Sequence, residues 1–143
     1  NLNIMTKELW INLPVKDVEK SRTFFTKMGF KLNTKYGNSK DSACFLIGEK
    51  NIVVMLFAEA VFKGFIRGEM TDAFKNNEVL ISIDAESRAE VDELAKRAAE
   101  AGGNVFGAPG ESQGWLYGCG FSDLDGHRWN VLYMDMSKMP PHS

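Results

Sequence analysis

Few side chains in this chain are of the types that bind transition metals or act as nucleophiles. The 143 residues include two histidines and two cysteines. His127 follows a glycine in a turn-like segment, where we expect an exposed histidine, and His142 lies in a proline-rich tail. Cys44 and Cys119 lack the Cys-x-x-Cys spacing of metal and redox sites. We expect them to be free, buried thiols in preference to a disulfide or a reactive thiol.

Glu78 is the acidic side chain that we expect to face a cavity. Two structural interpretations compete with a functional one: an ion pair with Arg128, or a solvated position at the end of a strand. In the functional interpretation, Glu78 is the counter-ion of a cationic ligand or a general base among apolar side chains. A base without a metal or a partner acid does little for a developing oxyanion, so Glu78 is only a weak catalytic candidate. Tyr117 or Asn130 could donate the missing hydrogen bond.

Alternation along the predicted strands divides their side chains between two faces. One face is uniformly apolar and is expected to pack beneath helices; it contains Ile11, Leu13, Val15, Val54, Leu56, Val79, Ile81, Ile83, Trp129, Val131 and Tyr133. The other face mixes apolar, aromatic and polar residues, which is typical of a ligand cavity. It contains Trp10, Asn12, Met55, Phe57, Glu78, Leu80, Ser82, Arg128, Asn130 and Leu132. Such a set suits a planar or cationic organic ligand through stacking and cation–π attraction.

Two further aromatic residues, Trp115 and Tyr117, are expected to contact the same ligand. They follow residues 109–114, a glycine-rich segment that we interpret as a lid over the cavity. Gly118 and Gly120 come next, and glycine within a strand indicates a bulge or the close approach of a ligand or a neighbouring group.

The candidate residues lie in two segments of the chain that share one order of predicted elements. The first starts at Trp10 and the second at Glu78, and each reads as strand, helix and glycine stop, followed by more strands. The expected helices are residues 18–28, preceded by Asp17 as N-cap, and 88–101, preceded by the capping-box sequence that starts at Ser87. The expected strands are 10–15, 30–36, 43–47, 52–57, 78–84, 104–106, 115–121 and 128–133.

The chain is therefore predicted to be one α+β domain, residues 1–143, made of two βαβββ modules. The first module spans residues 7–57 and the second 78–135, with a partly helical connector at 58–77 and a tail at 136–143. We expect the two modules to pair into a curved mixed sheet around a cleft.

Bulk composition excludes several classes of partner. The chain is 44% hydrophobic and 25% charged, with a net charge of −2 and no basic run, so nucleic acid is not an expected partner. No apolar stretch approaches the length of a membrane span and no leader precedes the first module, so we expect no membrane association. Unpaired cysteines favour a reducing cytoplasm. Whether residues 1–4, which precede Met5, are native is left open.

Two segments resemble the glyoxalase/bleomycin resistance/extradiol dioxygenase proteins, the vicinal oxygen chelate superfamily. Residues 10–30, WINLPVKDVEKSRTFFTKMGF, are similar to the opening of these proteins, and residues 122–135, SDLDGHRWNVLYMD, to their closing hairpin. The resemblance implies the two-module fold and, commonly, a homodimer. It leaves function open, because the superfamily includes lyases, isomerases, dioxygenases, thiol transferases and antibiotic-binding proteins.

Metal-dependent members resembling this chain take ligands from four positions, which correspond here to Trp10, Met55, Glu78 and Asn130. An indole N–H is only a donor, and a thioether suits soft Cu(I) better than Ni, Zn, Fe or Mn. We therefore predict no metal and no other cofactor.

These observations favour metal-independent binding of an aromatic or cationic small molecule, similar to bleomycin-resistance members. The expected ligand contacts are Trp10, Asn12, Met55, Phe57, Glu78, Trp115, Tyr117, Arg128 and Asn130. The alternatives are an enzyme similar to lactoylglutathione lyase or an extradiol dioxygenase, and a dimerisation or regulatory module with a vestigial pocket. Sequence does not decide whether the modules pair within one chain or between two chains.

Overall fold

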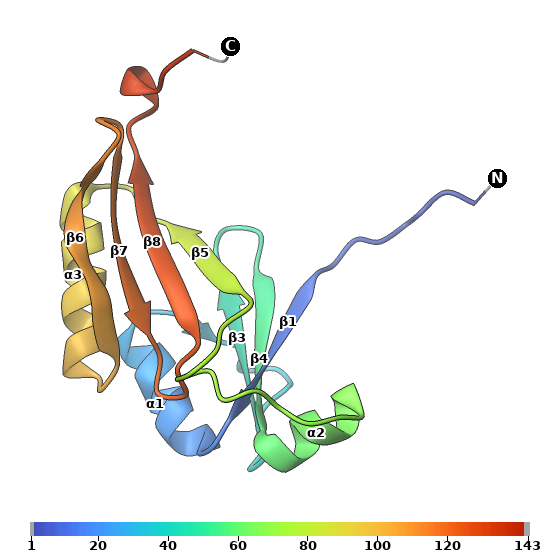
Figure 1. The fold of residues 1–143 in the computed structure, drawn as a ribbon. Helices are drawn as coiled ribbons and strands as arrows, with labels where there is room; N and C mark the ends of the chain where they lie inside the picture. Colours follow the sequence, from blue (N-terminus) through green and yellow to red (C-terminus); the bar gives the residue numbers. More distant parts are fainter. Residues whose placement is uncertain (1, 142–143) are drawn as a thin grey trace.

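The computed structural model describes residues 2–141, which form two similar halves (Figure 1). The first half contains β1 (Trp10–Val15), α1 (Val18–Lys27), β2 (Lys31–Leu32), β3 (Ser42–Ile47) and β4 (Ile52–Ala58). The helix α2 (Glu59–Ile66) begins the connector. The second half contains β5 (Leu80–Asp84), α3 (Arg88–Glu100), β6 (Asn104–Ser112), β7 (Leu116–Ser122) and β8 (Arg128–Met134), followed by a 3₁₀ turn, Met136–Lys138. None of the described helices is long and apolar enough to cross a membrane.

Local sequence explains where the two long helices begin and end. The Asp17 carboxylate accepts a hydrogen bond from the Lys20 N–H, and the Ser87 hydroxyl accepts one from the Glu90 N–H. After the helices, Gly29 and Gly102 have φ values of 94° and 102°, which side chains with a Cβ rarely adopt. The predicted helices are thus confirmed to within a residue at each end.

The strand order is the same in both halves. The first sheet has the order β1-β4-β3-β2 and the second β5-β8-β7-β6, with the first pair of each sheet parallel and the other pairs antiparallel. The α+β fold of two βαβββ modules is therefore confirmed. Within one chain the modules form two separate sheets, in which β1 and β5 are edge strands.

One core joins the two halves. Phe24 and Phe25 of α1 are buried against the second sheet, and the Phe25 ring centroid lies 5.6 Å from that of Trp129. Trp129 stacks in turn on Phe121, with centroids 6.1 Å apart. Both residues belong to the helix-facing side of the second sheet, and Val54 and Leu56 of the first sheet belong to the same core cluster. The helix-facing sides of both sheets therefore pack into one core, as the apolar face predicted.

Two predicted segments differ in the structure. Residues 30–36 contribute only the two-residue strand β2, whereas β6 continues to Ser112, so most of the segment predicted to be a lid is strand. Pro109 is tolerated there because β6 is an edge strand. Proline has no backbone N–H, and at a sheet edge this need not cost a hydrogen bond between strands. The reversal comes later, at Gln113 and Gly114, whose φ values are 58° and 77°.

Candidate functional site

The face of the first sheet opposite the core carries an aromatic hollow. Trp10, Val53, Leu46 and Lys31 lie opposite one another across four strands, so their side chains share this face. With Tyr36 they line a pocket of about 600 Å³. The next row contains Asn12, Met55 and Cys44, and then Phe57, whose ring packs edge-on against Phe65 of α2 at 5.0 Å. Four of the predicted ligand contacts, Trp10, Asn12, Met55 and Phe57, therefore share one wall, which we call the aromatic wall.

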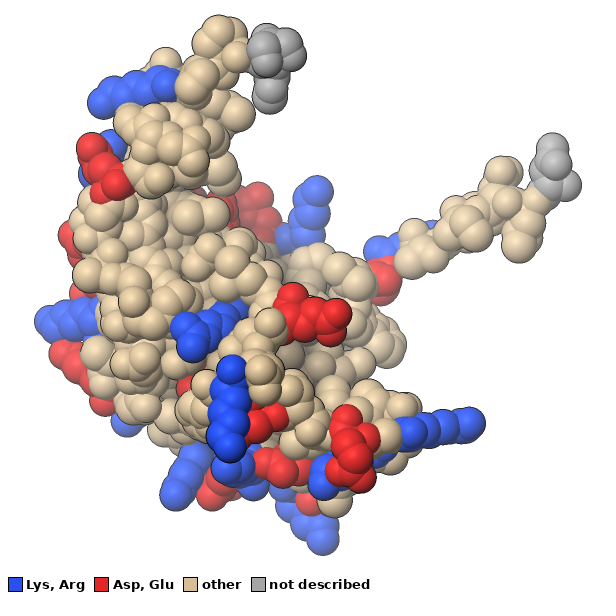
Figure 2. Space-filling model, viewed as in Figure 1, with Lys and Arg blue, Asp and Glu red and all other residues tan. Residues whose placement is uncertain are grey.

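The corresponding face of the second sheet holds a cation over an aromatic ring. Register places Leu80 beside Arg128, and Ser82 beside Asn130 and Gly120. A Cβ on Gly120 would lie 2.5 Å from the Phe106 ring, so that ring covers Gly120. The Arg128 Cζ lies 4.4 Å from the Phe106 centroid. The close approach predicted at Gly120 is thus made by a neighbouring ring. We call this face the arginine wall. Figure 2 shows that the surface over β7 and β8 is largely uncharged.

Glu78 lies outside the strands that form the two walls. It precedes β5, is exposed, and makes no ion pair with Arg128 within residues 2–141. The structural ion pair considered from sequence is therefore absent. The solvated interpretation agrees with this position, because the strand begins two residues later than expected.

Tyr117 lies on the other side of its strand. Its hydroxyl donates to Asp92 of α3 at 2.7 Å, and Arg88 lies 5.7 Å from its ring, so it belongs to the helix-facing side together with Cys119 and Phe121. The hydrogen bond to Asp92 raises the pKa of Tyr117. The prediction of Tyr117 as a cavity residue was wrong. Every second side chain of a strand lies on the same face, so Tyr117 shares the face of the buried Phe121 and not the face of the cavity. Trp115 precedes β7, and its indole N–H is buried without a partner among the described residues.

The two walls lie on the sheet faces opposite the shared core. The helix-facing sides of both sheets share a core, so the aromatic wall and the arginine wall each face away from that core. A larger hollow of about 940 Å³ lies between the β3–β4 turn and α3, with a charged lining that includes Glu49, Lys50, Glu90, Glu93 and Arg97. Lys31 and Leu46 of the aromatic wall and Ser82 of the arginine wall also line this hollow, but none of the predicted ligand contacts does. We therefore take the two walls, and not this hollow, as the candidate site.

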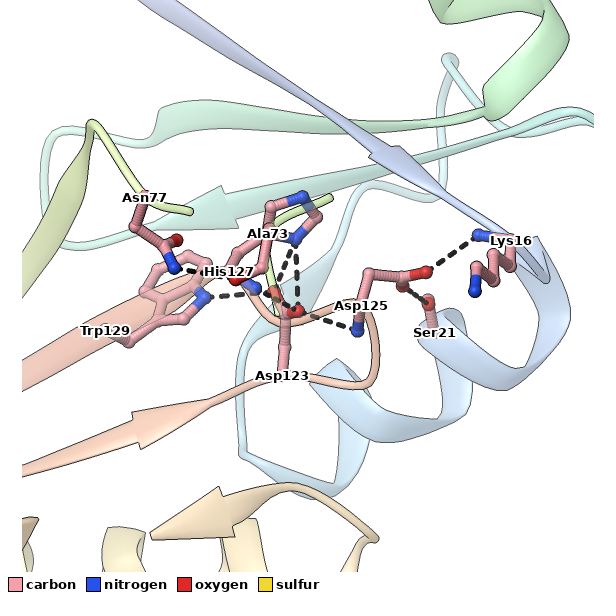
Figure 3. Close-up of polar contacts among 8 residues, drawn as sticks. All are labelled: Lys16, Ser21, Ala73, Asn77, Asp123, Asp125, His127 and Trp129. Atoms are coloured by element: carbon pink, nitrogen blue, oxygen red, sulfur yellow. Dashed lines mark hydrogen bonds and ion pairs between the residues drawn. The ribbon is translucent and has the colours of Figure 1, made fainter. Parts of the chain in front are cut away.

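A buried carboxylate organises the hairpin between β7 and β8, and sequence reasoning missed it (Figure 3). Asp123 is 4% exposed and accepts hydrogen bonds from the N–H groups of Asp125 and His127 and from the Trp129 indole. The His127 Nδ1 lies 2.9 Å from the Asp123 Oδ2. The expectation of an exposed His127 was wrong, since 12% of its side chain is accessible. The acidic residue four positions earlier was the available signal.

The same hairpin ties the second module to the first. The Asp125 carboxylate accepts from the Lys16 N–H at 2.9 Å and from the Ser21 hydroxyl at 3.3 Å. Burial raises the pKa of Asp125, and the bond from Lys16 only partly offsets this. The contacts join residues more than one hundred positions apart, so this cluster has a structural role in holding the modules together.

His127 is expected to make stability depend on pH. Burial lowers its pKa, but the hydrogen bond and charge of Asp123 more than offset burial, so the pKa in the folded state is raised. A raised pKa stabilises the fold fully below the unfolded value of 6.5, and this contribution is lost as pH rises through the folded-state pKa. Urea denaturation is expected to show stability falling between slightly acidic and alkaline pH, and a His127→Asn variant to lack that decline. If the unfolding free energy of both proteins falls equally with pH, His127 is not the cause of the decline.

Metal-ligating side chains do not converge in the part of the chain that the structure describes. No group of three or more His, Cys, Asp or Glu side chains is arranged to hold an ion within residues 2–141. His142 lies outside these residues. Cys44 and Cys119 are free and buried, as predicted, and burial raises the pKa of the Cys119 thiol, which suits an unreactive side chain.

Comparison with known proteins agrees with this geometry. Residues 7–48 match the family model described as bleomycin resistance protein-like N-terminal. The hypothetical protein SA1046 from S. aureus is 36% identical, with a TM-score of 0.79 over 90% of this chain and 95% of that one. No curated protein matches the sequence.

Two more distant structures share the fold. A glyoxalase-related enzyme from Fulvimarina pelagi has 16% identity and a TM-score of 0.77, over 91% of this chain and 88% of its own. A glyoxalase/bleomycin resistance protein/dioxygenase family enzyme from Burkholderia phytofirmans also has 16% identity, with a TM-score of 0.73 over 87% and 96%. Together with the repeated βαβββ order and the matching opening segment, these findings show that the chain belongs to the glyoxalase/bleomycin resistance/dioxygenase superfamily.

Proposed function

We propose that this protein binds a small aromatic molecule, without a metal, in a cleft formed between two copies of the chain. The observation that carries the proposal is the pair of open walls, each mixing apolar, aromatic and polar side chains, and each ending at an edge strand. Cavities that bind organic ligands have this mixed composition, whereas a face sealed in a core does not.

The edges of the walls support a homodimer. At the start of β1 and β5, Leu9, Trp10, Val79 and Leu80 are 62%, 61%, 65% and 52% exposed. Apolar residues beside an unpaired strand edge form a surface that readily pairs with another chain. A two-fold dimer that places β1 of one copy next to β5 of its partner covers the β1 edge and the β5 edge of each copy. Each cleft then consists of one copy's aromatic wall and the other copy's arginine wall.

The donor atoms at the four positions that resemble those of metal-dependent relatives support metal independence. Trp10 and Met55 lie on the aromatic wall, Asn130 on the arginine wall, and Glu78 is exposed ahead of β5. An indole, a thioether and a carboxamide beside one carboxylate do not fit a hard divalent ion. The residues therefore do not fit the superfamily's metal, and we derive no step that uses one. The free cysteines further support a cytoplasmic location.

Mixing two variants tests whether the cleft binds a ligand and whether it lies between two copies of the chain. We expect sedimentation to show a dimer, and a panel of planar aromatic molecules, screened in excess chelator, to include at least one that raises the melting temperature. Trp10→Ala and Asn130→Phe each damage one wall, and each variant alone is expected to lose binding. Refolding them together is expected to restore about a quarter of the clefts, because half of the dimers are mixed and each has one intact cleft.

Three results would contradict this proposal. If the mixed sample binds no better than either variant, the walls belong to the same chain. If wild-type binding disappears in chelator, a metal is required, which favours an enzyme of the lyase or dioxygenase type. A folded dimer that binds no member of the panel favours the regulatory alternative.

A further inference from the structure

Arg128 has an unusual environment on the arginine wall. Its guanidinium lies over the Phe106 ring, with the Cζ 4.4 Å from the centroid. This arrangement depends on Gly120, since any Cβ there would collide with the Phe106 ring. Arg128 is half-buried, and Asn130 and Ser82 lie in the adjacent row of the same face. The cation is therefore held in place by packing, with polar side chains beside it.

Arg128 has no acidic partner within residues 2–141. Three other arginines of the chain meet carboxylates: Arg22 pairs with Glu19, Arg88 with Glu111, and Arg97 with Glu93. The Arg128 guanidinium makes no such pair and no hydrogen bond to a described residue. A partly desolvated guanidinium without an anion has lost hydration that, among the described residues, only the Phe106 ring partly replaces.

The strands of the partner's aromatic wall do not supply the missing acid. The strands β1, β2, β3 and β4 contain no aspartate or glutamate. On the arginine wall itself, Asp84 pairs with Leu132, four residues along β8 from Arg128, which is a separation of about 13 Å. Glu78 is exposed and precedes β5, and Glu8 is exposed ahead of β1, where it lines the aromatic-wall pocket together with Lys31, Lys35 and Lys50. Among the strand residues of the cleft, Arg128 therefore has no nearby anion.

We propose that Arg128 binds an anionic group of the ligand, such as a carboxylate, and so makes the cleft selective for aromatic anions. This inference rests on the proposed function and reverses the charge preference expected from Glu78. A guanidinium forms paired, charge-assisted hydrogen bonds with carboxylates, which strengthen where water is partly excluded. Asn130 and Ser82 lie where they can donate further hydrogen bonds to the same group, and the Trp10 indole of the aromatic wall suits the ligand's ring.

Three probes with one ring system and different charges test the proposal: 2-naphthoate, 2-naphthamide and 2-naphthylmethylammonium, measured by equilibrium dialysis with the full-length dimer. We expect the wild type to bind naphthoate about tenfold more tightly than the amide, and the ammonium most weakly. Arg128→Gln is expected to abolish the preference for naphthoate and leave amide binding unchanged, with Arg128→Lys intermediate. Lys96→Gln is the matched control, because it removes one exposed positive charge from α3, on the opposite side of the second sheet from the arginine wall, and should change none of the three affinities.

The possible failures are distinguishable. If the amide or ammonium binds as tightly as naphthoate, or if Arg128→Gln weakens all three probes equally, the anion selectivity is wrong while small-molecule binding stands. An Arg128→Gln variant that weakens the dimer and keeps its preference for naphthoate would assign Arg128 to the interface and overturn the inference. If no probe binds the folded wild-type dimer at millimolar concentration, both this inference and the proposed function fail for aromatic ligands. If the Arg128→Gln variant does not fold, Arg128→Lys, which retains the charge, still tests the preference for naphthoate over the amide.

Discussion

Replacing Asp123 with alanine is expected to lower the free energy of unfolding by about 3–4 kcal/mol, because buried donors and a buried imidazole would lose their common acceptor. The carboxylate accepts from two backbone N–H groups and from the Trp129 indole, and it faces the His127 Nδ1 (Figure 3). Since Trp129 is fully buried in the shared core, its orphaned N–H cannot turn to water. Urea denaturation monitored by tryptophan fluorescence measures the loss.

Asp135 provides the matched control for this substitution. Its carboxylate also accepts from a nearby backbone N–H and a hydroxyl, both from Ser137, but Asp135 follows the end of β8 and 20% of its side chain is accessible, against 2% for Asp123. Asp135→Ala should therefore change stability much less than Asp123→Ala. Similar losses for the two variants would show that Asp123 acts only as an ordinary turn residue.

The second large effect is expected at Gly126, in the same hairpin. Its φ is 88°, and a Cβ would lie 2.7 Å from the Phe74 N and 2.8 Å from the Ala73 carbonyl carbon. Because both obstacles are backbone atoms of the connector, Gly126→Ala adds a steric collision to the cost of a left-handed conformation. We expect a loss of about 3 kcal/mol or more in unfolding free energy.

Gly114 separates the two contributions. It has a similar φ of 77°, but no heavy atom lies within 4 Å of the position of its Cβ. Gly114→Ala should therefore lose only the conformational part, about 1 kcal/mol. The difference between the two variants, measured by the same denaturation, isolates the contact between hairpin and connector. Equal losses at both glycines would mean that the connector simply moves aside.

Local patterns predicted the fold well, because most of its determinants are short-range. The caps at Asp17 and Ser87, the glycine stops and the two-residue alternation all act within one or two turns of chain. The repeat then fixed the order of the elements. There were two exceptions. Only β2 of the predicted strand 30–36 forms, and at β6 Pro109 and Gly110 indicated a turn but the strand continues, since an edge position tolerates both.

The site was less predictable because it depends on distant contacts. Alternation placed Trp10, Asn12, Met55 and Asn130 on open faces, but it could not show that these faces belong to two walls that point away from one core. The Phe106–Arg128 contact crosses three strands through the space left by Gly120. The glycine was noticed in the sequence, but nothing local identified which group approaches it.

The shared core also constrains how the protein is made. Phe24 and Phe25 emerge early in synthesis, yet the residues that cover them include Phe121 and Trp129, near the other end of the chain. Asp125 likewise reaches back to Lys16 across 109 positions. The first half must therefore wait, with Phe24 and Phe25 only partly covered, until residues 121–129 have left the ribosome. During that interval the nascent chain is most exposed to chaperones and to aggregation.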